Sequence, residues 1–477
     1  MAITSKQDSR RRIVIDNIHG DIELTEQEWR IVNTATFQRL RSLKQLGMGH
    51  LVYPNATHTR FAHSLGVFKI MSRIVEKLQN GKPPNKKARL EHENLRLAAL
   101  LHDVGHYPYS HLMERVDHVE LTEQVLDGEH KKKRTLEASK LPYPDHESLG
   151  RMILLSQADI LNEIGGEERT REIGALFSRT EAANSQLSKL IHSSLDMDRL
   201  DYLLRDARAA GVPYGEIDLN YLLNNIRISS KGTLGVEYKA LPAAEHFLLA
   251  RLFMHRVVYY HKTTYGLEEA CRQLLKRMRD SGRYEEMARD GTEIESLCKG
   301  PKLATFTDSY VDSLIQKAAS DEDPIIKTLA ECIINRRPPK LLAEVSGLFQ
   351  KEGKHNSVHS FKNRCKDNLE KLAKEFDVPL GMFLLGGPKP VKIEERGALL
   401  TEKEARSLKA EEREELIKVF EPGGEEPKSI VELSDTLVKH LSGHHFGIFR
   451  LYLADSRPHG HPQIEAIQKK VQAWIDE

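Results

Sequence analysis

The sequence has little cysteine and no long apolar run. It holds only four cysteines, with no CxxC pair among them: Cys271, Cys298, Cys332 and Cys365. This wide spacing argues against a zinc knuckle or a disulfide framework and is typical of a reducing compartment. The longest apolar runs, such as LRLAALL, are far shorter than the ~20 residues that span a bilayer. The start, MAITSKQDSRRR, has no apolar stretch after its charges. We therefore expect a cytoplasmic protein without a membrane partner.

An excess of either charge is also lacking. Lysine and arginine number 71 against 70 acidic residues, so the protein has no global field to attract nucleic acid, and any polyanion site must be a local pocket. The basic run at residues 131–134 is interpreted as a solvated loop, with phosphate steering or nucleic-acid binding as the less favoured interpretation. A content of 39% apolar and 30% charged residues indicates a globular protein.

The apolar periodicity predicts a mainly α fold in two parts. Residues 12–24 alternate around a His19-Gly20 turn, which predicts a hairpin. Helical spacing begins near residue 26, and NLRLAALLHDVGH predicts a buried helix. It continues through three further stretches, 186–210, 243–280 and 308–335. The polar stretch 127–145 predicts a surface insertion. Strands at 378–385 and 446–454 and a closing amphipathic helix follow, so we predict a large helical domain (1–345) and a smaller α+β lobe (346–477).

Histidines and carboxylates in the helical part form the candidate chemical site. They are His63 in RFAHSLG, His102-Asp103 in LLHDVGH, His146-Glu147 in PDHES and Asp198 in DMDRLDYLLRD. Imidazole and carboxylate are suitable ligands for divalent first-row metals. A charged residue within a buried helix needs a partner or a metal. A single histidine on an apolar helix is more often a hydrogen-bonded core residue, so the hypothesis rests on the whole set.

Taken together, these motifs resemble those of the HD superfamily. HTRFAHSLGV, LLHDVGHYPYSH and DMDRLDYLLRDARAAGV are most similar to its deoxynucleoside triphosphate triphosphohydrolases of the SAM-and-HD-domain type. The similarity covers roughly residues 10–340, beginning at IDNIHGDIEL and FQRLRSLKQLGMGHLVYPNATHTRFAHSLG, and we expect no SAM-like domain before it. The resemblance implies an HD-type helical domain that hydrolyses a dNTP to a deoxynucleoside and tripolyphosphate.

The resemblance also assigns roles around the metal. Its metal ligands would be His63, His102, Asp103 and Asp198. The ion is left open among manganese, iron, magnesium, nickel and zinc. The catalytic residues would be His106, His111, Glu114, His146 and Glu147, with His111 protonating the leaving 5′-oxygen and Glu114 standing where the family has aspartate. A continuing helix would place His106 on the face of His102, whereas a helix ending at Gly105 would turn the later histidines back over the ion.

Substrate and activator contacts are implied in the same way. The substrate-binding residues would be Gln45, Arg60, Arg199, Tyr202, Asp206, Arg251 and Tyr259. Arg199 stands where the family usually has lysine, and Tyr260 stands where better-known relatives carry glutamine. A tyrosine ring packed under C2′ would exclude a ribose hydroxyl.

An activating nucleotide is the other implied ligand. In the family it binds where subunits meet and assembles a tetramer. The aligned residues are Arg12, Ile13, Asn33, Gln38, Arg41 and Arg336. Asn33 replaces the aspartate that accepts two hydrogen bonds from guanine, and an asparagine amide does not accept both. We therefore expect a weakened preference for guanine activators, or a different activator altogether.

Three functions of different classes stay open at this point. The first is a dNTP triphosphohydrolase. The second is an HD phosphatase or phosphodiesterase acting on nucleoside monophosphates or cyclic nucleotides. The third is a protein that binds single-stranded nucleic acid or a nucleotide signal at a vestigial metal centre. Release of tripolyphosphate marks the first, release of orthophosphate the second, and salt-dependent binding without turnover the third.

Overall fold

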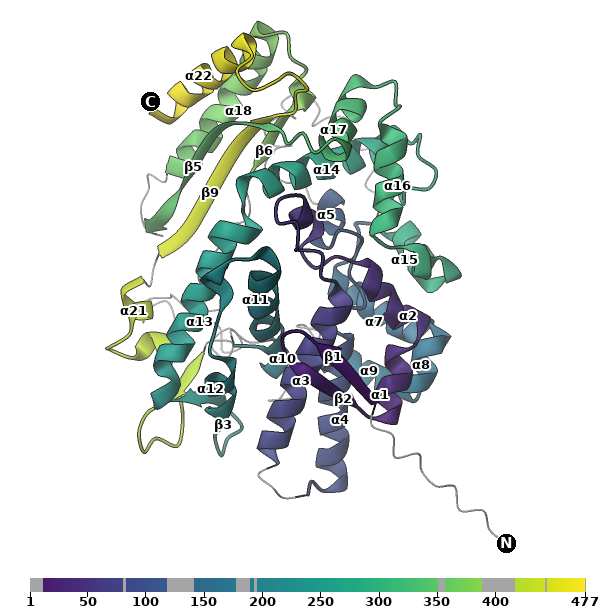
Figure 1. The fold of residues 1–477 in the computed structure, drawn as a ribbon, viewed down its shortest axis with the longest axis vertical. Helices are drawn as coiled ribbons and strands as arrows, with labels where there is room; N and C mark the ends of the chain where they lie inside the picture. The colour runs from purple at the N-terminus through teal and green to yellow at the C-terminus, as the bar shows by residue number, and fades with distance from the viewer. Residues whose placement is uncertain are drawn as a thin grey trace.

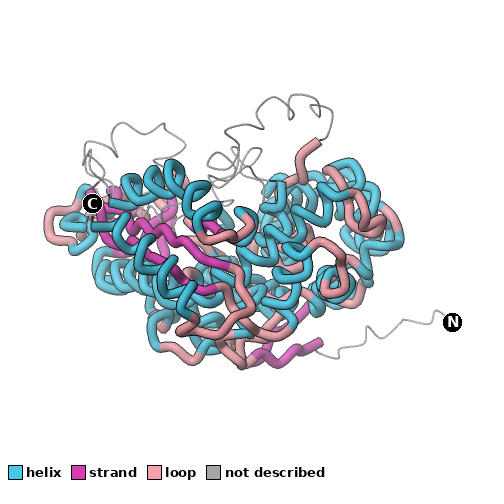
Figure 2. Tube along the Cα trace, turned by 90° about the horizontal axis from the view of Figure 1, so that it is seen from above, coloured by secondary structure: helices cyan, strands magenta, loops and turns pink. Residues whose placement is uncertain are grey.

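The structure is a computed structural model that describes residues 12–79, 83–117, 141–176, 189–192, 195–350, 357–387, 417–441 and 444–476. Figure 1 shows helices over most of the chain and a sheet-containing lobe around β5, β9 and α22. Figure 2 shows the strands gathered mainly at the end where the C-terminus lies. The predicted mainly α fold with a smaller α+β C-terminal lobe is confirmed. The basic run at 131–134 and most of the predicted insertion at 127–145 lie outside the described residues.

A hairpin and a series of short helices form the N-terminal part. The predicted hairpin is confirmed, with Arg12 paired to Leu24 and Asp16 to Gly20. The elements are β1 (Arg12–Asp16), β2 (Gly20–Leu24), α1 (Glu26–Val32), α2 (Ala35–Gln38), η1 (Arg39–Ser42) and η2 (Gly47–Leu51). The helical run predicted after residue 26 is therefore broken into short pieces. Thr25 and Thr34 each cap a new helix through the side-chain oxygen, which stops one continuous helix from forming.

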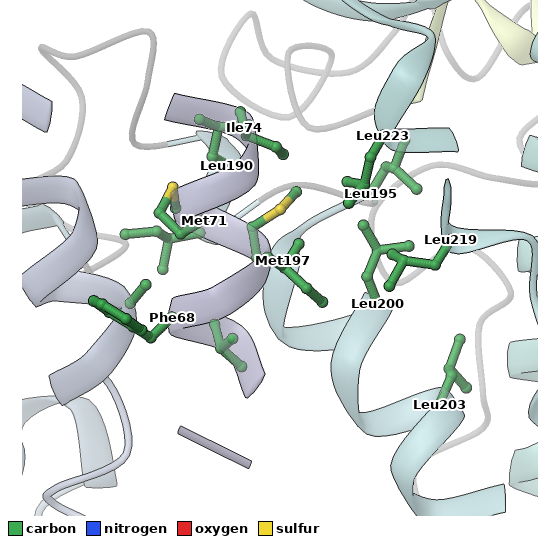
Figure 3. Packing of buried hydrophobic residues seen from close by; sticks show 14 of the residues in the cluster. Phe68, Met71, Ile74, Leu190, Leu195, Met197, Leu200, Leu203, Leu219 and Leu223 are labelled. Atoms are coloured by element: carbon green, nitrogen blue, oxygen red, sulfur yellow. The ribbon is translucent and has the colours of Figure 1, made fainter. Parts of the chain in front are cut away.

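The centre of the helical domain consists of α3, α4 and α11. The helices here are α3 (Arg60–Leu78), α4 (Lys86–Leu101), α5 (His111–Glu114), η3 (Arg115–Asp117), α7 (His146–Ser156), α8 (Ala158–Ile164), α9 (Glu167–Leu176), α10 (Lys189–His192) and α11 (Met197–Ala210). Phe68 and Met71 of α3 pack near Met197 and Leu200 of α11 in a buried apolar cluster (Figure 3). Burial of this kind stabilises by about 25 cal/mol per Å² of apolar surface, so the core fixes how α3 lies against α11.

The second half of the helical domain contains a small sheet that the apolar pattern did not reveal. Its elements are η8 (Pro213–Gly215), α12 (Leu219–Asn224), β3 (Ile226–Ile228), β4 (Leu234–Glu237), η9 (Tyr238–Ala240), α13 (Leu241–Met254), a π-helical turn η10 (His255–Tyr259), α14 (Lys262–Ser281), α15 (Gly291–Lys299), η11 (Pro301–Thr305), α16 (Asp308–Ala318) and α17 (Pro324–Ile334). The three stretches predicted as helical, 186–210, 243–280 and 308–335, are thus each divided by a turn. β3 and β4 are too short to show strand periodicity.

The C-terminal lobe is a three-stranded antiparallel sheet in the order β5-β9-β6, with α18 and α22 packed near it (Figure 1). Its elements are β5 (Lys340–Gln350), α18 (Ser357–Glu375), η12 (Leu380–Met382), β6 (Phe383–Gly386), β9 (His444–Leu453) and α22 (Pro462–Asp476). Between β6 and β9 the chain returns to the helical domain through β7 (Lys418–Phe420), β8 (Lys428–Ser429), η13 (Ile430–Glu432) and α21 (Leu437–Leu441). There β7 pairs with β4 in a parallel arrangement. The boundary at residue 345 stays a prediction, and residues 417–441 contribute to the core of the helical domain.

Within the described residues, none of the helices combines the length and the apolar character needed to cross a bilayer. The four cysteines are buried free thiols.

Helix α7 lies in unusually close contact with the turn that follows α4. A Cβ atom added at Gly105 would lie 2.0 Å from the His146 carbonyl oxygen and 2.3 Å from the Gly150 nitrogen. Real Cβ atoms do not approach backbone atoms so closely. Gly105 therefore permits two backbones to meet where no side chain fits.

This contact predicts the effect of a single methyl group. Gly105→Ala is expected to lower the free energy of unfolding by about 1–3 kcal/mol, because the overpacked backbone of α7 has to move. Chemical denaturation monitored by circular dichroism measures the change. Gly300→Ala is the matched control, since its added Cβ meets nothing nearer than 3.4 Å. Equal stability of the two variants would contradict the predicted contact.

Candidate metal centre and active site

The four predicted metal ligands come from three separate helical segments that the core brings together. His63 lies on α3, and Asp198 lies in the first turn of α11. Helix α4 ends at Leu101, and His102 is its C-cap residue. Of the two alternatives, the continuing helix is wrong: a turn follows α4 directly, so the helix ends before Gly105 and the chain turns before His106. Backbone hydrogen bonds from Val104 and His106 close that turn.

The ligand atoms of this group lie close together. His63, His102 and Asp198 each offer one atom within 4.8 Å of the others. His63 Nε2 lies 2.9 Å from Asp198 Oδ1, and His102 Nε2 lies 4.0 Å from the same oxygen. Asp103 joins them, with Oδ1 at 3.2 Å from His102 Nε2 and Oδ2 at 3.8 Å from His63 Nε2. The structure therefore brings all four predicted ligands together.

The chemistry of these donors fits a divalent cation. His63 is fully buried, and Nε2 of both His63 and His102 faces carboxylate oxygens within 3.2 Å without forming a hydrogen bond of good geometry among the described residues. A cation shared by these atoms would satisfy the imidazole lone pairs and the carboxylates together. Burial lowers the pKa of His63, but the carboxylates of Asp198 and Asp201 outweigh it and raise the pKa to about 10. The site thus favours positive charge, and the Asp198 side chain is 38% exposed, so it is open to solvent on that side.

A second layer of residues, which sequence reasoning missed, holds His63 in place. Asp201 is fully buried, and its Oδ2 lies 2.8 Å from His63 Nδ1. Its Oδ1 lies 2.6 Å from His19 Nε2, and Arg205 donates to both oxygens. Arg205 also donates to Asp16, at the end of β1. These contacts fix the ring orientation of His63 so that Nε2 points at the ligand group. The one signal in the sequence was a second aspartate three residues after Asp198.

Two buried arginines position the turn that carries Asp103. Arg60 donates from Nη1 to Asp103 Oδ2 at 2.7 Å and from Nε to Ser110 Oγ. Burial raises the pKa of Asp103, but Arg60 and the neighbouring imidazoles outweigh it and hold the pKa well below the usual range. Arg39, also missed, donates to three backbone carbonyls: those of Val104, His106 and Phe306. The carboxylate is therefore ionised and its turn is held rigidly.

The three predicted catalytic histidines gather beside the metal group. His106 Nε2 lies 3.2 Å from Asp103 Oδ1, and its ring stacks on that of His146 with centroids 4.2 Å apart. Glu114 contacts both other histidines, with Oε2 at 2.8 Å from His111 Nδ1 and Oε1 at 3.1 Å from His146 Nδ1. Tyr109 and Ser110, in the connecting turn, have left-handed φ angles of 52° and 57°. Such strain is typical of active sites, and Asp308 supports it by accepting from the Tyr109 amide.

The charges of these histidines differ. Burial, together with Arg60, holds the pKa of His106 well below its ordinary value, so this ring is neutral. Burial also lowers the pKa of His146, but the Glu114 carboxylate outweighs it and raises the pKa. Glu147 follows His146 in the first turn of α7 and is partly buried. The pKa values of these two stacked rings are therefore shifted in opposite directions.

A polar group further along α11 contains several predicted sugar contacts. Tyr259 donates to Asp206 Oδ2 at 2.8 Å, and His58 Nε2 lies 2.7 Å from Asp206 Oδ1. Tyr202 lies edge-on to Tyr259, with centroids 6.1 Å apart. The Oε1 atom of Gln45 is buried without a hydrogen-bond partner among the described residues. His58 was missed, although it stands two residues before Arg60 in the HTRFAHSLG motif.

Two predicted substrate-binding arginines, Arg199 and Arg251, act on the same histidine. Burial lowers the pKa of His255, and the positive charges of both arginines lower it further, to about 3. His255 is neutral and begins the π-helical turn, a local feature often found at functional sites. Arg199 pairs with Asp196, the N-cap of α11. Burial raises the pKa of Asp196 to about 6. Sequence reasoning missed both His255 and Asp196.

The predicted activator contacts lie on the surface, mostly around α1. Arg12 pairs with Glu26 and lies over Trp29, while Ile13 is 41% exposed. Asn33 donates to the Trp29 carbonyl.

The other predicted activator contacts also have partners within this chain. Gln38 donates to the Val32 carbonyl and accepts from Arg41, which lies over the Phe61 ring. Arg336 contacts a different element, donating to the Leu51 carbonyl in η2. The structure therefore groups five of the six residues near α1 and α2 and leaves Arg336 on another segment.

Comparison with known families agrees with this geometry. A family model described as "HD domain" matches residues 60–206, and one described as "HD associated region" matches residues 217–299. The first range contains the four ligand residues and the histidine cluster. The chain therefore contains an HD domain over residues 60–206, followed by an HD-associated region, and the candidate site lies within the first of these.

Relatives of this class were found in several organisms. The chain is 29% identical to the uncharacterized protein YwfO of Bacillus subtilis over 71% of its length and 73% of that protein. It is 34% identical to an uncharacterized protein of Methanocaldococcus jannaschii, over 53% of this chain and 46% of that one. It is 29% identical to the deoxynucleoside triphosphate triphosphohydrolase SAMHD1 of Gallus gallus, over 53% of this chain and 43% of that one. The chain thus spans less than half of the latter two proteins.

A solved structure has the same fold. The crystal structure of a phosphohydrolase from Bacteroides thetaiotaomicron matches with a TM-score of 0.68 and 23% identity, over 93% of this chain and all of that one.

The second layer around His63 gives a testable prediction. Asp201→Asn is expected to weaken binding of Mn²⁺ by roughly 10–100-fold, because His63 loses the negative charge that fixes its ring and raises its basicity. Isothermal titration calorimetry with Mn²⁺ measures the effect, and thermal denaturation verifies the fold. Asp218→Asn is the matched control, since this exposed residue caps α12 and asparagine caps equally well. Unchanged Mn²⁺ affinity in Asp201→Asn would refute the role of the second layer.

Proposed function

We propose that this protein is a metal-dependent dNTP triphosphohydrolase that releases a deoxynucleoside and tripolyphosphate. The observation that carries the proposal is the order of side chains along α11. Asp198, Tyr202 and Asp206 recur every four residues and so share one face of the helix. One face of α11 therefore leads from the metal ligand Asp198, past the region of Arg199 and Arg251, to Asp206 and its partner Tyr259. A substrate with a phosphate end and a sugar end matches that sequence of chemistries.

The proposed chemistry at the phosphate end uses residues already in place. A divalent ion held by His63, His102, Asp103 and Asp198 supplies Lewis acidity and lowers the pKa of water. Arg60, Arg199 and Arg251 balance the negative charge of the triphosphate, and arginine suits phosphate because its planar fork donates two hydrogen bonds. His111, oriented by Glu114, is proposed to protonate the leaving 5′-oxygen. Glu114 is one methylene longer than the aspartate of the family, yet it contacts both His111 and His146.

The proposed sugar selectivity depends on the tyrosines. Tyr259 is tied to Asp206, and Tyr202 packs edge-on beside it, so neither ring is free to move away from a sugar. A ribose 2′-hydroxyl would have to displace a ring or leave a polar group unpaired, and both cost binding energy. Gln45, with its unpaired buried oxygen, is proposed to accept from the 3′-hydroxyl.

Regulation by a nucleotide at a subunit interface, in a tetramer, is a further part of the proposal. It is supported by the exposed arginines and by the exposed Ile13 on β1. The side-chain nitrogen of Asn33 donates to the Trp29 carbonyl. The side-chain oxygen is the one acceptor atom that Asn33 could offer to a base, whereas an aspartate has two. Strict activation by GTP would contradict this part without affecting the hydrolase itself.

Product analysis tests the reaction. Protein loaded with Mn²⁺ and incubated with each dNTP, alone and mixed, is expected to release tripolyphosphate, which ion chromatography separates from orthophosphate and pyrophosphate. Asp103→Ala is expected to lose metal binding and turnover, because a ligand and the partner of Arg60 disappear together. Release of orthophosphate from nucleoside monophosphates, or cleavage of cyclic nucleotides without tripolyphosphate, would instead identify an HD phosphatase or phosphodiesterase.

The tyrosine hypothesis has its own test. Tyr259→Ala is expected to reduce the preference for dATP over ATP, measured as the ratio of kcat/KM values, by roughly tenfold or more, because the ring that excludes the 2′-hydroxyl is gone. Tyr221→Ala on α12 is the control, since this tyrosine is 40% exposed and its hydroxyl donates to the Lys239 carbonyl, which is no proposed substrate contact. An unchanged ratio in Tyr259→Ala would rule out Tyr259 as the sugar discriminator.

A further inference from the structure

A pocket outside the metal site lies where α7, α9 and the end of α15 meet. Its volume is about 440 Å³, within the range of small-molecule sites. The residues that line it are Ser148, Arg151, Met152, Leu155, Ser156, Thr170, Arg171, Gly174 and Lys299. None of these lining residues was assigned above to catalysis, substrate binding or activation.

The charge of this pocket is one-sided. Three cations line it, Arg151 from α7, Arg171 from α9 and Lys299 from α15, and no carboxylate occurs among the described lining residues. Arg171 pairs with Glu167 and Lys299 pairs with Glu295, each within its own helix, and all four side chains are at least 43% exposed. Such surface pairs contribute little, so an anion can replace them at small cost. Like charges gathered in a concave site raise the local concentration of anions.

The residues that form the walls of the pocket indicate which chemical groups an anionic ligand would contain. Met152 and Leu155 provide an apolar wall, and Gly174 leaves room opposite Arg151, whose Cγ lies 3.2 Å from where a Cβ would be. Ser148, Ser156 and Thr170 add hydroxyl oxygens. Two arginines and a lysine suit phosphate oxygens, and an apolar wall suits an organic group attached to them.

The pocket and the active site lie on opposite faces of α7. Ser148, Arg151, Met152 and Leu155 recur at three- and four-residue steps, so they share the face toward the pocket. His146 and Gly150, also four residues apart, share the other face, where Gly150 meets Gly105 of the turn after α4. A ligand in the pocket would therefore contact the helix that carries His146 without entering the metal site.

We propose that this pocket is a second binding site, specific for a phosphorylated small molecule. Its phosphate contacts Arg151, Arg171 and Lys299, and its organic part packs on Met152 and Leu155. The proposal goes beyond the proposed hydrolase activity and does not require it.

Binding measurements on the full chain test the proposal. Tripolyphosphate, orthophosphate and deoxyadenosine monophosphate are titrated by calorimetry into Mn²⁺-loaded protein. The double variant Arg171→Glu/Lys299→Glu is expected to lose one class of binding site, with affinity for it falling at least about tenfold. Tighter binding of the nucleotide than of orthophosphate would support the role of the apolar wall. Tighter binding of tripolyphosphate than of either would indicate a polyphosphate ligand.

The control is a double variant that changes the net charge by the same amount at another place on the protein. Lys327→Glu/Lys374→Glu makes the same change of net charge on exposed helix positions away from the pocket. If both double variants bind the three probes as the unmodified protein does, or lose the same amount of affinity, the pocket is not a binding site and the proposal fails. Since binding is measured directly, absence of dNTP hydrolysis in the product assay would leave this result unaffected.

Discussion

The buried carboxylate of Asp201 is the interaction on which the site depends. It accepts hydrogen bonds from His63, His19 and Arg205 with no exposure to water, so it joins α3, α11 and the N-terminal hairpin at one point. A buried charge is tolerated only when it is paired in this way, and each partner is in turn held by the charge. Gly66 makes the arrangement possible, because a Cβ there would lie 1.9 Å from Asp201 Oδ1. Loss of any member would leave an unpaired polar group behind the ligand histidine.

A second constraint acts where the backbone of α7 contacts the backbone of the turn after α4. Gly105 and Gly150 allow α7 to lie against the turn after α4, and Arg39 holds the carbonyls on either side of Gly105. His146 is thereby placed beside His106, and Glu114 ties His146 to His111. The candidate catalytic histidines are thus positioned by packing of glycine and arginine residues that carry no chemistry of their own. The same helix presents its other face to the basic pocket.

Much of the fold followed from apolar periodicity, and its failures have two causes. The hairpin at 12–24, the strand at 446–454 and the closing helix are regular and long enough for their period to be evident. Divisions of the long helical stretches were missed because single capping residues, such as Thr34 and Asp196, end or begin helices without changing the apolar stripe. β3, β4 and β7 were missed because a strand of three or four residues has no measurable period, and the pairing of β4 with β7 joins Val236 to Val419, far apart in the sequence.

The sequence by itself determined which residue types are available for chemistry: two histidines and two carboxylates in apolar surroundings, each recognisable because a polar group needs a reason to be buried. It also indicated that His63 and Asp198 lie on helices. Only the tertiary structure decided that α4 ends at Leu101, that the four side chains converge, and that Asp201, His19 and Arg39 support them. The physical reason is that ligand geometry depends on contacts between segments distant in sequence. Local propensity sets where a helix forms, whereas packing and paired buried charges set where its side chains meet.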